Sequence, residues 1–300
     1  MTAQRLHLSD RTQFALMLSP WLIGLALIII GPAVAGFALA FTHYNAMGPP
    51  RFAGLANFRE LLHDDLFHTA LQNSLTYILL AVPLRLVGAL LTALLLLQPR
   101  PGTSLFRAMV FLPTVIPDLA WALIWLWILN PIVGPLNRAL SVVGVNGPAW
   151  TVDTTWAPIG IILMMSWQIG EGFVICLASL QNVGRDVLDQ SAVDGGTTLR
   201  TIWNVSLPLI APAMLLLVCR DTVLSLQANF VPALIVGRGG DPDNATLYLP
   251  MHIYTTGFGY LRFGYAAALT TSMYVITAAI VWLQFRVASR WGVGFRDVDA

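Results

Sequence analysis

Long apolar stretches alternate with shorter polar segments along the whole chain. Six of the stretches reach the roughly 20 residues that an α-helix needs to cross a hydrocarbon core of about 30 Å. They cover residues 14–41, 69–97, 108–129, 157–180, 209–236 and 265–287. The pattern predicts an all-α membrane protein whose six transmembrane helices form a single domain over residues 1–300.

The arginine distribution predicts the orientation of these helices. If the N-terminus lies in the cytoplasm, nine arginines fall in cytoplasmic segments and five in external segments. The nine are Arg5, Arg11, Arg100, Arg107, Arg185, Arg200, Arg286, Arg290 and Arg296. Because basic residues are enriched in cytoplasmic segments, we expect both the N- and the C-terminus to be cytoplasmic.

The connection at residues 181–208 differs from the other predicted cytoplasmic segments. It is long and polar, and an amphipathic stretch at 183–193 is followed by Asp194, Gly195 and Gly196. Glycine readily adopts the left-handed conformation that ends a helix. We therefore expect a short helix along the cytoplasmic face, between the fourth and fifth transmembrane helices. Taken alone, such a helix is typical of an interfacial anchor.

The composition agrees with a membrane protein and excludes several classes of mechanism. Hydrophobic residues make up 57% of the chain and charged residues 10%. All 16 basic residues are arginine, so the chain has no lysine for a nucleotide-binding P-loop or a Schiff base. Cys176 and Cys219 lie in apolar runs, which favours neither a disulfide framework nor a metal site. The net charge of +1 does not favour binding to nucleic acid.

Polar side chains inside the predicted spans are candidates for a substrate site. A charge at the bilayer centre costs about 2.5 kcal/mol or more, so it normally faces a cavity or a partner. Amides, carboxylates and guanidinium groups bind hydroxyl-rich ligands, and an aromatic ring such as that of Trp167 packs on a sugar. We predict that seven residues bind substrate: Gln168, Glu171, Arg220, Asp221, Ser225, Gln227 and Asn229.

Several of these groups have structural alternatives. Arg220 and Glu171 are equally expected to form an ion pair that holds two helices together, and Asp221 to pair with a partner subunit. For Arg85 a structural pair or snorkelling is favoured, whereas Asp118 fits a helix interface or a cavity wall. An unpaired Arg220 facing the cavity would favour an anionic substrate, and a paired Arg220 a neutral sugar.

Metal binding and catalysis are not expected. The histidines form no recognised ligand spacing, and no serine, histidine and aspartate set shares a credible site. We predict neither a metal site nor catalytic residues in this chain.

A motif in the 181–208 connection resembles a known family. Its residues are Asp189, Gln190 and Ser191, then after three residues Gly195, after nine more Val205, and finally Leu207 and Pro208. This spacing is similar to the EAA motif of permease subunits in ABC importers, Glu-Ala-Ala, three residues, Gly, nine residues, Ile, one residue, Leu-Pro. Asp189 replaces the glutamate of the motif, while Gln190 and Ser191 replace its alanines.

Two further stretches resemble the maltose-type, sugar-transporting branch of that family. One contains Phe52, Gly54, Leu55, Asn57 and Phe58, and the other Gly239, Gly240, Pro242, Thr246, Tyr254, Phe258, Gly264, Tyr265 and Ala268. The second stretch is similar to the ending of the F-like permease, the first of the two permeases in such a system. Asp241 interrupts its Gly-Gly-Pro run.

The resemblance implies a function and a set of partners. It implies a bacterial cytoplasmic-membrane permease that imports a carbohydrate or related polyol by alternating access. The partners would be a second permease in a heterodimer, two copies of a P-loop ATPase and an extracytoplasmic binding protein. ATP and Mg²⁺ would bind to the ATPase, so this chain would bind no cofactor and would not be an enzyme. The ATPase would bind the short helix predicted in the 181–208 connection, which would couple ATP hydrolysis to transport. The contact residues of this coupling helix and its end would be Arg185, Val187, Leu188, Asp189, Ala192, Asp194 and Gly195.

Two alternatives to this function stay open. One is a proton-coupled secondary transporter that uses Glu171, Arg220 and Asp221, against which stands the lack of inverted pairs of broken helices in the sequence pattern. The other is an ABC importer for a solute that is not a sugar.

Overall fold

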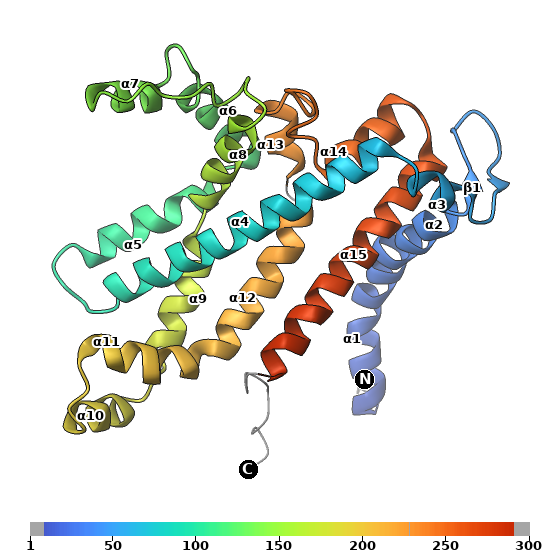
Figure 1. Cartoon of the computed structure of the whole chain (residues 1–300). Helices are drawn as coiled ribbons and strands as arrows, with labels where there is room; N and C mark the ends of the chain where they lie inside the picture. The colour runs from blue at the N-terminus through green and yellow to red at the C-terminus, as the bar shows by residue number, and fades with distance from the viewer. Residues whose placement is uncertain (1–8, 228, 291–300) are drawn as a thin grey trace, which may run out of the picture. The chain divides into compact units, whose positions relative to one another are not determined.

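The computed structural model describes residues 9–227 and 229–290, and nearly all of their regular structure is helical (Figure 1). Arg5 and Arg296, which contribute to the predicted orientation, lie outside the described residues. The α-helices are α1 (Asp10–Gly24), α2 (Gly31–Leu39), α3 (Ala56–Leu61), α4 (Asp65–Leu95), α5 (Thr103–Phe111), α6 (Asp118–Ile128), α7 (Pro135–Val142), α8 (Trp156–Ser166), α9 (Gly170–Gln181), α10 (Arg185–Val193), α11 (Thr198–Thr201), α12 (Leu207–Gln227), α13 (Phe230–Ile235), α14 (Leu249–Tyr254) and α15 (Phe263–Arg290).

Shorter elements join some of these helices. π-helical turns at Leu25–Ile30, Ile202–Ser206 and Thr255–Gly259 adjoin α-helices, and a 3₁₀ turn at Leu112–Val115 follows α5. β1 (Thr42–His43) and β2 (Arg51–Phe52) form an antiparallel hairpin in which Thr42 pairs with Phe52 and His43 with Arg51.

Four helical segments are long and apolar enough to cross a membrane, and two bent pairs raise the number to six if each pair is one span. The four are Arg11–Leu39, Asp65–Leu95, Thr198–Ile235 and Phe263–Arg290. The pairs are Thr103–Val115 with Asp118–Ile128, and Trp156–Ser166 with Gly170–Gln181. A protein with four to six apolar helical spans is therefore confirmed.

The predicted third and fourth helices, at 108–129 and 157–180, are each bent in the structure. The helix axis bends by 102° between α5 with its 3₁₀ turn and α6, and by 46° between α8 and α9. The first bend lies at Ile116, which is extended because Pro117 disfavours the helical conformation of the residue before it. The second bend follows Trp167, and α9 starts afresh at Gly170. Each pair taken as a whole is apolar enough to cross a membrane, which is why average hydropathy does not reveal the breaks.

The fifth segment begins earlier than predicted. Helical structure starts at Thr198 instead of residue 209, passes through the π-helical turn Ile202–Ser206 and continues as α12. The connection between α9 and this segment therefore contains little more than α10, the short helix expected from the amphipathic pattern.

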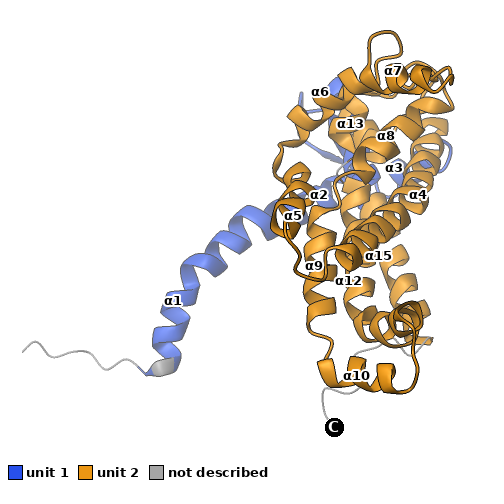
Figure 2. Cartoon of the chain, turned by 90° about the vertical axis from the view of Figure 1, so that its left-hand side faces the viewer, with its two compact units in different colours: residues 1–63, 255–271 blue, residues 64–254, 272–300 orange. Residues whose placement is uncertain are grey.

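The chain forms two compact units, coloured separately in Figure 2. Unit 2 contains the described residues of 64–254 and 272–290, and its core lies where α4 packs against α9 and α12. The buried side chains at this centre are Ala89, Ala93, Phe173, Cys176, Leu177, Leu180, Ile210 and Leu217. Small alanines on α4 let α9 approach closely, since a Cβ on Gly172 would lie 3.2 Å from the Cβ of Ala89.

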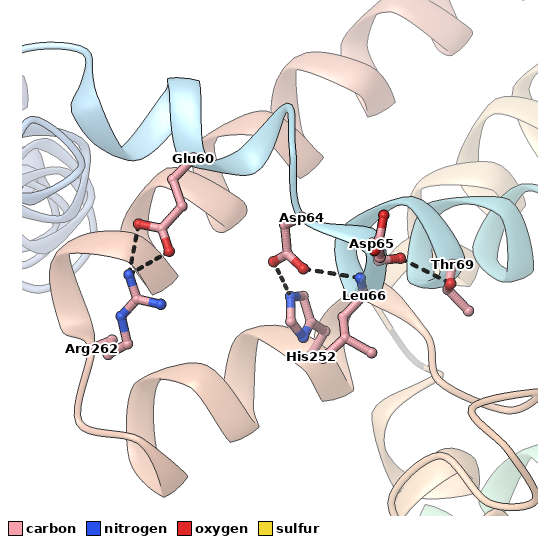
Figure 3. A network of polar contacts seen from close by, with 7 residues as sticks. All are labelled: Glu60, Asp64, Asp65, Leu66, Thr69, His252 and Arg262. Carbon is pink, nitrogen blue, oxygen red and sulfur yellow. Dashed lines mark hydrogen bonds and ion pairs between the residues drawn. The ribbon is translucent and has the colours of Figure 1, made fainter.

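Hydrogen bonds fix the loop that leads into α14. The Asn73 amide donates to the carbonyl oxygens of Asn244 and Leu247 at 2.8 and 3.0 Å, and the Thr246 hydroxyl donates to the carbonyl oxygen of Asp241 at 2.6 Å. His252 on α14 contacts the Asp64 carboxylate at 3.2 Å, where Asp64 also caps the start of α4 through the Leu66 amide (Figure 3). These bonds hold the 237–254 segment on α4.

Unit 1 contains the described residues up to His63 together with 255–271. The Asn57 amide, on a side chain only 1% exposed, donates to the carbonyl oxygens of Ala40 and Thr42 at 2.8 and 2.9 Å. Gly54 has a φ of +56°, a conformation that favours glycine. The Arg262 guanidinium donates to both Glu60 carboxylate oxygens at 2.6 and 2.7 Å (Figure 3). In the stretch from Phe52 to Phe58, the positive φ therefore favours glycine at position 54, and the two buried hydrogen bonds favour asparagine at position 57.

Gly264→Ala is expected to destabilise the protein by about 1–3 kcal/mol, the range of overpacking in a filled site. A Cβ at Gly264 would clash with the carbonyl oxygen of Thr42. Thermal unfolding of the detergent-purified protein measures the effect. Gly36→Ala is the matched control in the same unit, because nothing lies within 4 Å of its Cβ position. Equal unfolding midpoints for the two variants would contradict the prediction.

Candidate functional site

A cavity of about 350 Å³ opens in unit 2 between α4, α9 and α12. The structure places five of the predicted substrate-binding residues on its wall: Gln168, Glu171, Arg220, Asp221 and Ser225. Tyr77, Arg85, Thr114 and Asp118 join them from α4, the 3₁₀ turn and α6. The wall thus combines carboxylates, guanidinium groups, an amide, hydroxyls and a phenol.

Helical spacing and the two breaks bring these side chains together. Leu217, Asp221 and Ser225 recur every four residues and form one face of α12. Gln168 lies in the break between α8 and α9, whereas Glu171 lies in the first turn of α9. Asp118 is the first residue of α6, directly after the break at Pro117. Broken membrane helices commonly build substrate sites in this way, because their free ends line a cavity.

Two arginines and two carboxylates form a continuous ionic network on the cavity wall. Arg85 Nε lies 3.1 Å from Asp221 Oδ2, and Arg85 Nη2 donates a hydrogen bond to Ser225 Oγ. Arg220 pairs with the Glu171 carboxylate, and its Nη1 lies 3.7 Å from Asp221 Oδ1. The network therefore joins α4, α9 and α12.

The two halves of the network differ in burial. The side chains of Arg85 and Asp221 are 11% and 21% exposed, whereas those of Arg220 and Glu171 are 39% and 53% exposed. Pairing offsets the cost of placing charge in a low-dielectric environment, and that cost rises with burial. Arg85, expected to pair structurally or to snorkel, is therefore paired within the cavity wall, and the predicted Arg220–Glu171 pair is present.

Tyr77 is the aromatic residue of the cavity. Its ring makes an edge-to-face contact with that of Tyr248, with centroids 5.7 Å apart. Tyr248 lies just before α14, and its complete burial raises its pKa above the ordinary value, so its phenol stays protonated. Neither phenol oxygen has a hydrogen-bond partner among the described residues. Trp167, expected to supply a ring, does not line this cavity and is 61% exposed.

The remaining two predicted substrate-binding residues lie outside this cavity. Gln227 is the last residue of α12 and is exposed. Asn229 begins the next helix and is fully buried, and its amide has no hydrogen-bond partner in the described part of the chain. Depth in the membrane grouped these residues with Asp221 and Ser225, but Gln227 lies on another face of α12 and Asn229 lies beyond the end of that helix.

The predicted coupling residues lie on α10 and at its end. Arg185, Val187, Leu188, Asp189 and Ala192 belong to the helix, none of whose residues is buried. Asp194 follows as the cap, and Gly195 has a φ of +76°, so the helix ends through a left-handed glycine as predicted.

The end of α10 is held against the next segment. The Gly196 amide donates to the Ser191 carbonyl oxygen at 2.9 Å, and the Ser191 and Thr201 hydroxyls are hydrogen-bonded at 2.8 Å. A Cβ on Gly196 would lie 2.6 Å from that carbonyl oxygen, which leaves room only for glycine. The α10 helix is therefore exposed along its length, while hydrogen bonds hold its C-terminal end against the following segment.

Comparison with protein families decides what kind of protein carries this site. Residues 86–293 match the family described as "Binding-protein-dependent transport system inner membrane component". The chain belongs to this family. It is thus a permease subunit of an ABC transport system, which confirms the resemblance drawn from the motif at 189–208.

Curated relatives extend over almost the whole permease. The probable ABC transporter permease protein YesP of Bacillus subtilis is 32% identical over 278 residues, which are 91% of this chain and 89% of that protein. The lactose transport system permease protein LacF of Rhizobium radiobacter is 29% identical, with 91% and 93% covered. The sn-glycerol-3-phosphate transport system permease protein UgpA of Agrobacterium fabrum is 28% identical, with 92% and 94% covered.

A solved structure shares the fold of this permease. A chain of a bacterial ABC transporter involved in the import of the acidic polysaccharide alginate superposes with a TM-score of 0.79. The two sequences are 22% identical, and the match covers 94% of this chain and 96% of the other. Family membership, and not a lack of broken helices, decides against a secondary transporter, because two bent pairs are present.

Proposed function

We propose that this permease is the membrane-spanning subunit of an ATP-driven importer for a carbohydrate or a related polyol, in a bacterial cytoplasmic membrane. Relatives named as permeases for lactose, sulfoquinovosyl glycerol and sn-glycerol-3-phosphate support this class of cargo. An importer for another kind of solute stands as the second candidate.

The observation that carries the proposal is the chemistry of the cavity wall. Gln168 and the carboxylates of Asp118 and Glu171 accept or donate hydrogen bonds, as sugar hydroxyls require. A single cavity at the junction of broken helices thus offers the polar contacts that a carbohydrate needs.

Coupling to ATP hydrolysis would run through α10. This helix lies in the connection between α9 and α12, which carry Glu171 and Asp221 into the cavity wall. An ATPase bound to its exposed surface would move both helices when it closes on ATP, and so switch the access of the cavity. Arg185, Val187, Leu188, Asp189 and Ala192 supply the contact surface.

We further propose six spans with both termini in the cytoplasm, each bent pair counting as one span. The excess of arginines in the segments that would be cytoplasmic supports this orientation, which also places α10 in the cytoplasm. The hairpin β1–β2 and α14 then lie on the external side, where a binding protein delivers substrate.

The complete transporter would contain four further chains or copies. These are a second permease, two P-loop ATPase subunits that hold ATP and Mg²⁺, and an extracytoplasmic binding protein. This chain would bind no cofactor and catalyse no reaction, which fits its lack of lysine for a P-loop.

Affinity purification of the chain from its native membrane in mild detergent, followed by mass spectrometry, tests the proposed assembly. Recovery of a second permease and a P-loop ATPase in stoichiometric amounts is expected. Recovery of this chain alone, under cross-linking conditions that preserve other membrane complexes, would contradict it.

A further inference from the structure

Both arginines of the cavity wall are neutralised by carboxylates of the same chain. Arg85 is paired with Asp221 at 3.1 Å, and Arg220 is paired with Glu171 and lies 3.7 Å from Asp221. The hydrogen bond from Arg85 Nη2 to Ser225 Oγ also stays within the chain. The guanidinium groups are thus committed to internal partners.

The wall also carries a carboxylate beyond those needed for this compensation. Asp118 lines the same cavity, is exposed, and has no ion-pair partner among the described residues. Two guanidinium groups therefore face three carboxylates, and the uncompensated charge on this wall is negative.

A charged sugar and a neutral sugar would meet this wall differently. A carboxylate or phosphate on the substrate would be repelled by Asp118. To pair with an arginine it would also have to displace Asp221 or Glu171, which costs free energy in a low-dielectric cavity. The hydroxyl groups of a neutral sugar would donate hydrogen bonds to these same carboxylates and accept a hydrogen bond from the Gln168 amide.

We propose that the cavity wall formed by this permease selects uncharged sugars and discriminates against sugar acids and sugar phosphates, because its arginines are neutralised internally and its net charge is negative. The inference rests on the proposed function, and it narrows the carbohydrate class at the same site.

Direct binding to the purified complex tests the selection. The complete permease–ATPase complex, without the binding protein, is dialysed to equilibrium against radiolabelled pairs of sugars: glucose with glucuronate, galactose with galacturonate, and mannose with mannuronate. At least one neutral sugar is expected to bind, and its acid counterpart to bind at least tenfold more weakly. Equal or tighter binding of the acids would overturn the inference.

Two substitutions of opposite sign give the inference a second test. Glu171→Gln removes the first partner of Arg220 and leaves it only the 3.7 Å contact to Asp221, so the preference for the neutral sugar over its acid is expected to narrow at least threefold. Arg220→Gln leaves the Glu171 carboxylate without this partner and is expected to widen that preference. Asp118→Asn removes the same charge as Glu171→Gln but takes no partner from an arginine. It is therefore expected to narrow the preference for the neutral sugar less than Glu171→Gln does. Size-exclusion chromatography confirms assembly of each variant. A preference that stays the same in both Glu171→Gln and Arg220→Gln would refute the inference.

The outcome also separates this inference from the proposed function. A complex that binds sugars without regard to charge, and still couples them to ATP hydrolysis, overturns the selectivity alone. A complex that binds none of the six sugars, and whose ATP hydrolysis is not stimulated by any sugar-loaded binding protein, overturns both the selectivity and the proposed function.

Discussion

Uptake by the complete transporter is expected to fall at least tenfold when Asp189→Lys and Gly195→Val are combined. Asp189 lies on the exposed α10, so its reversal replaces an attractive contact to a basic group of the ATPase by a repulsive one. Gly195 has a φ of +76°, which costs a β-branched residue about 1–2 kcal/mol and reshapes the end of the helix. Uptake of labelled sugar by cells is measured together with the amount of complex in the membrane.

The matched control is Gln190→Lys combined with Gly184→Val. Gln190 is the exposed neighbour of Asp189, so the new charge is added without loss of the carboxylate. Gly184 has a φ of −57°, and its Cβ position meets only the Val187 side chain at 3.9 Å, so valine causes no comparable strain there. Coupling through α10 would be wrong if the two double variants transported equally well.

Asp221→Leu is expected to destabilise the permease by about 3–5 kcal/mol, the cost of leaving a buried charge without its partner. The substitution removes the carboxylate that pairs with Arg85, whose side chain is only 11% exposed. The unfolding midpoint of the detergent-purified complex reports the loss. Adding Arg85→Met to Asp221→Leu is expected to restore most of the stability, because no orphaned charge remains.

Glu171→Leu serves as the comparison for that experiment. It leaves Arg220 without its first partner, but the Arg220 side chain is 39% exposed and still lies near Asp221. Solvent screening limits the cost of such a pair to about 1 kcal/mol or less. If Asp221→Leu is no more damaging than Glu171→Leu, the buried half of the network does not stabilise the junction of α4 and α12.

Hydropathy predicts the spans of this permease well because the bilayer imposes a length on every apolar helix. It does not predict the bends before α6 and α9, since each bent pair as a whole is apolar enough to pass as one span. Pro117 is the local signal for the first bend, through its effect on Ile116. The second bend, after Trp167, coincides with two glycines and two polar residues, Gln168, Gly170, Glu171 and Gly172, which the prediction placed inside one helix.

The sequence predicts those cavity residues that lie on one face of a single helix. Asp221 and Ser225 lie four residues apart on α12, so their depth and their face agree. Gln227 shares their depth but not their face. Arg85 and Tyr77 reach the cavity from α4 through tertiary packing, which no spacing within α4 reveals. The ion pair between Arg85 and Asp221 likewise joins helices far apart in the sequence.

ATP hydrolysis by the reconstituted complex tests the central claim most directly. The permease, its partner permease and the ATPase subunits are placed in proteoliposomes, and hydrolysis is measured with and without sugar-loaded binding protein. Stimulation of hydrolysis together with accumulation of labelled sugar inside the vesicles is the predicted result. Hydrolysis that does not respond to any sugar-loaded binding protein, with no accumulation of sugar, would contradict the account.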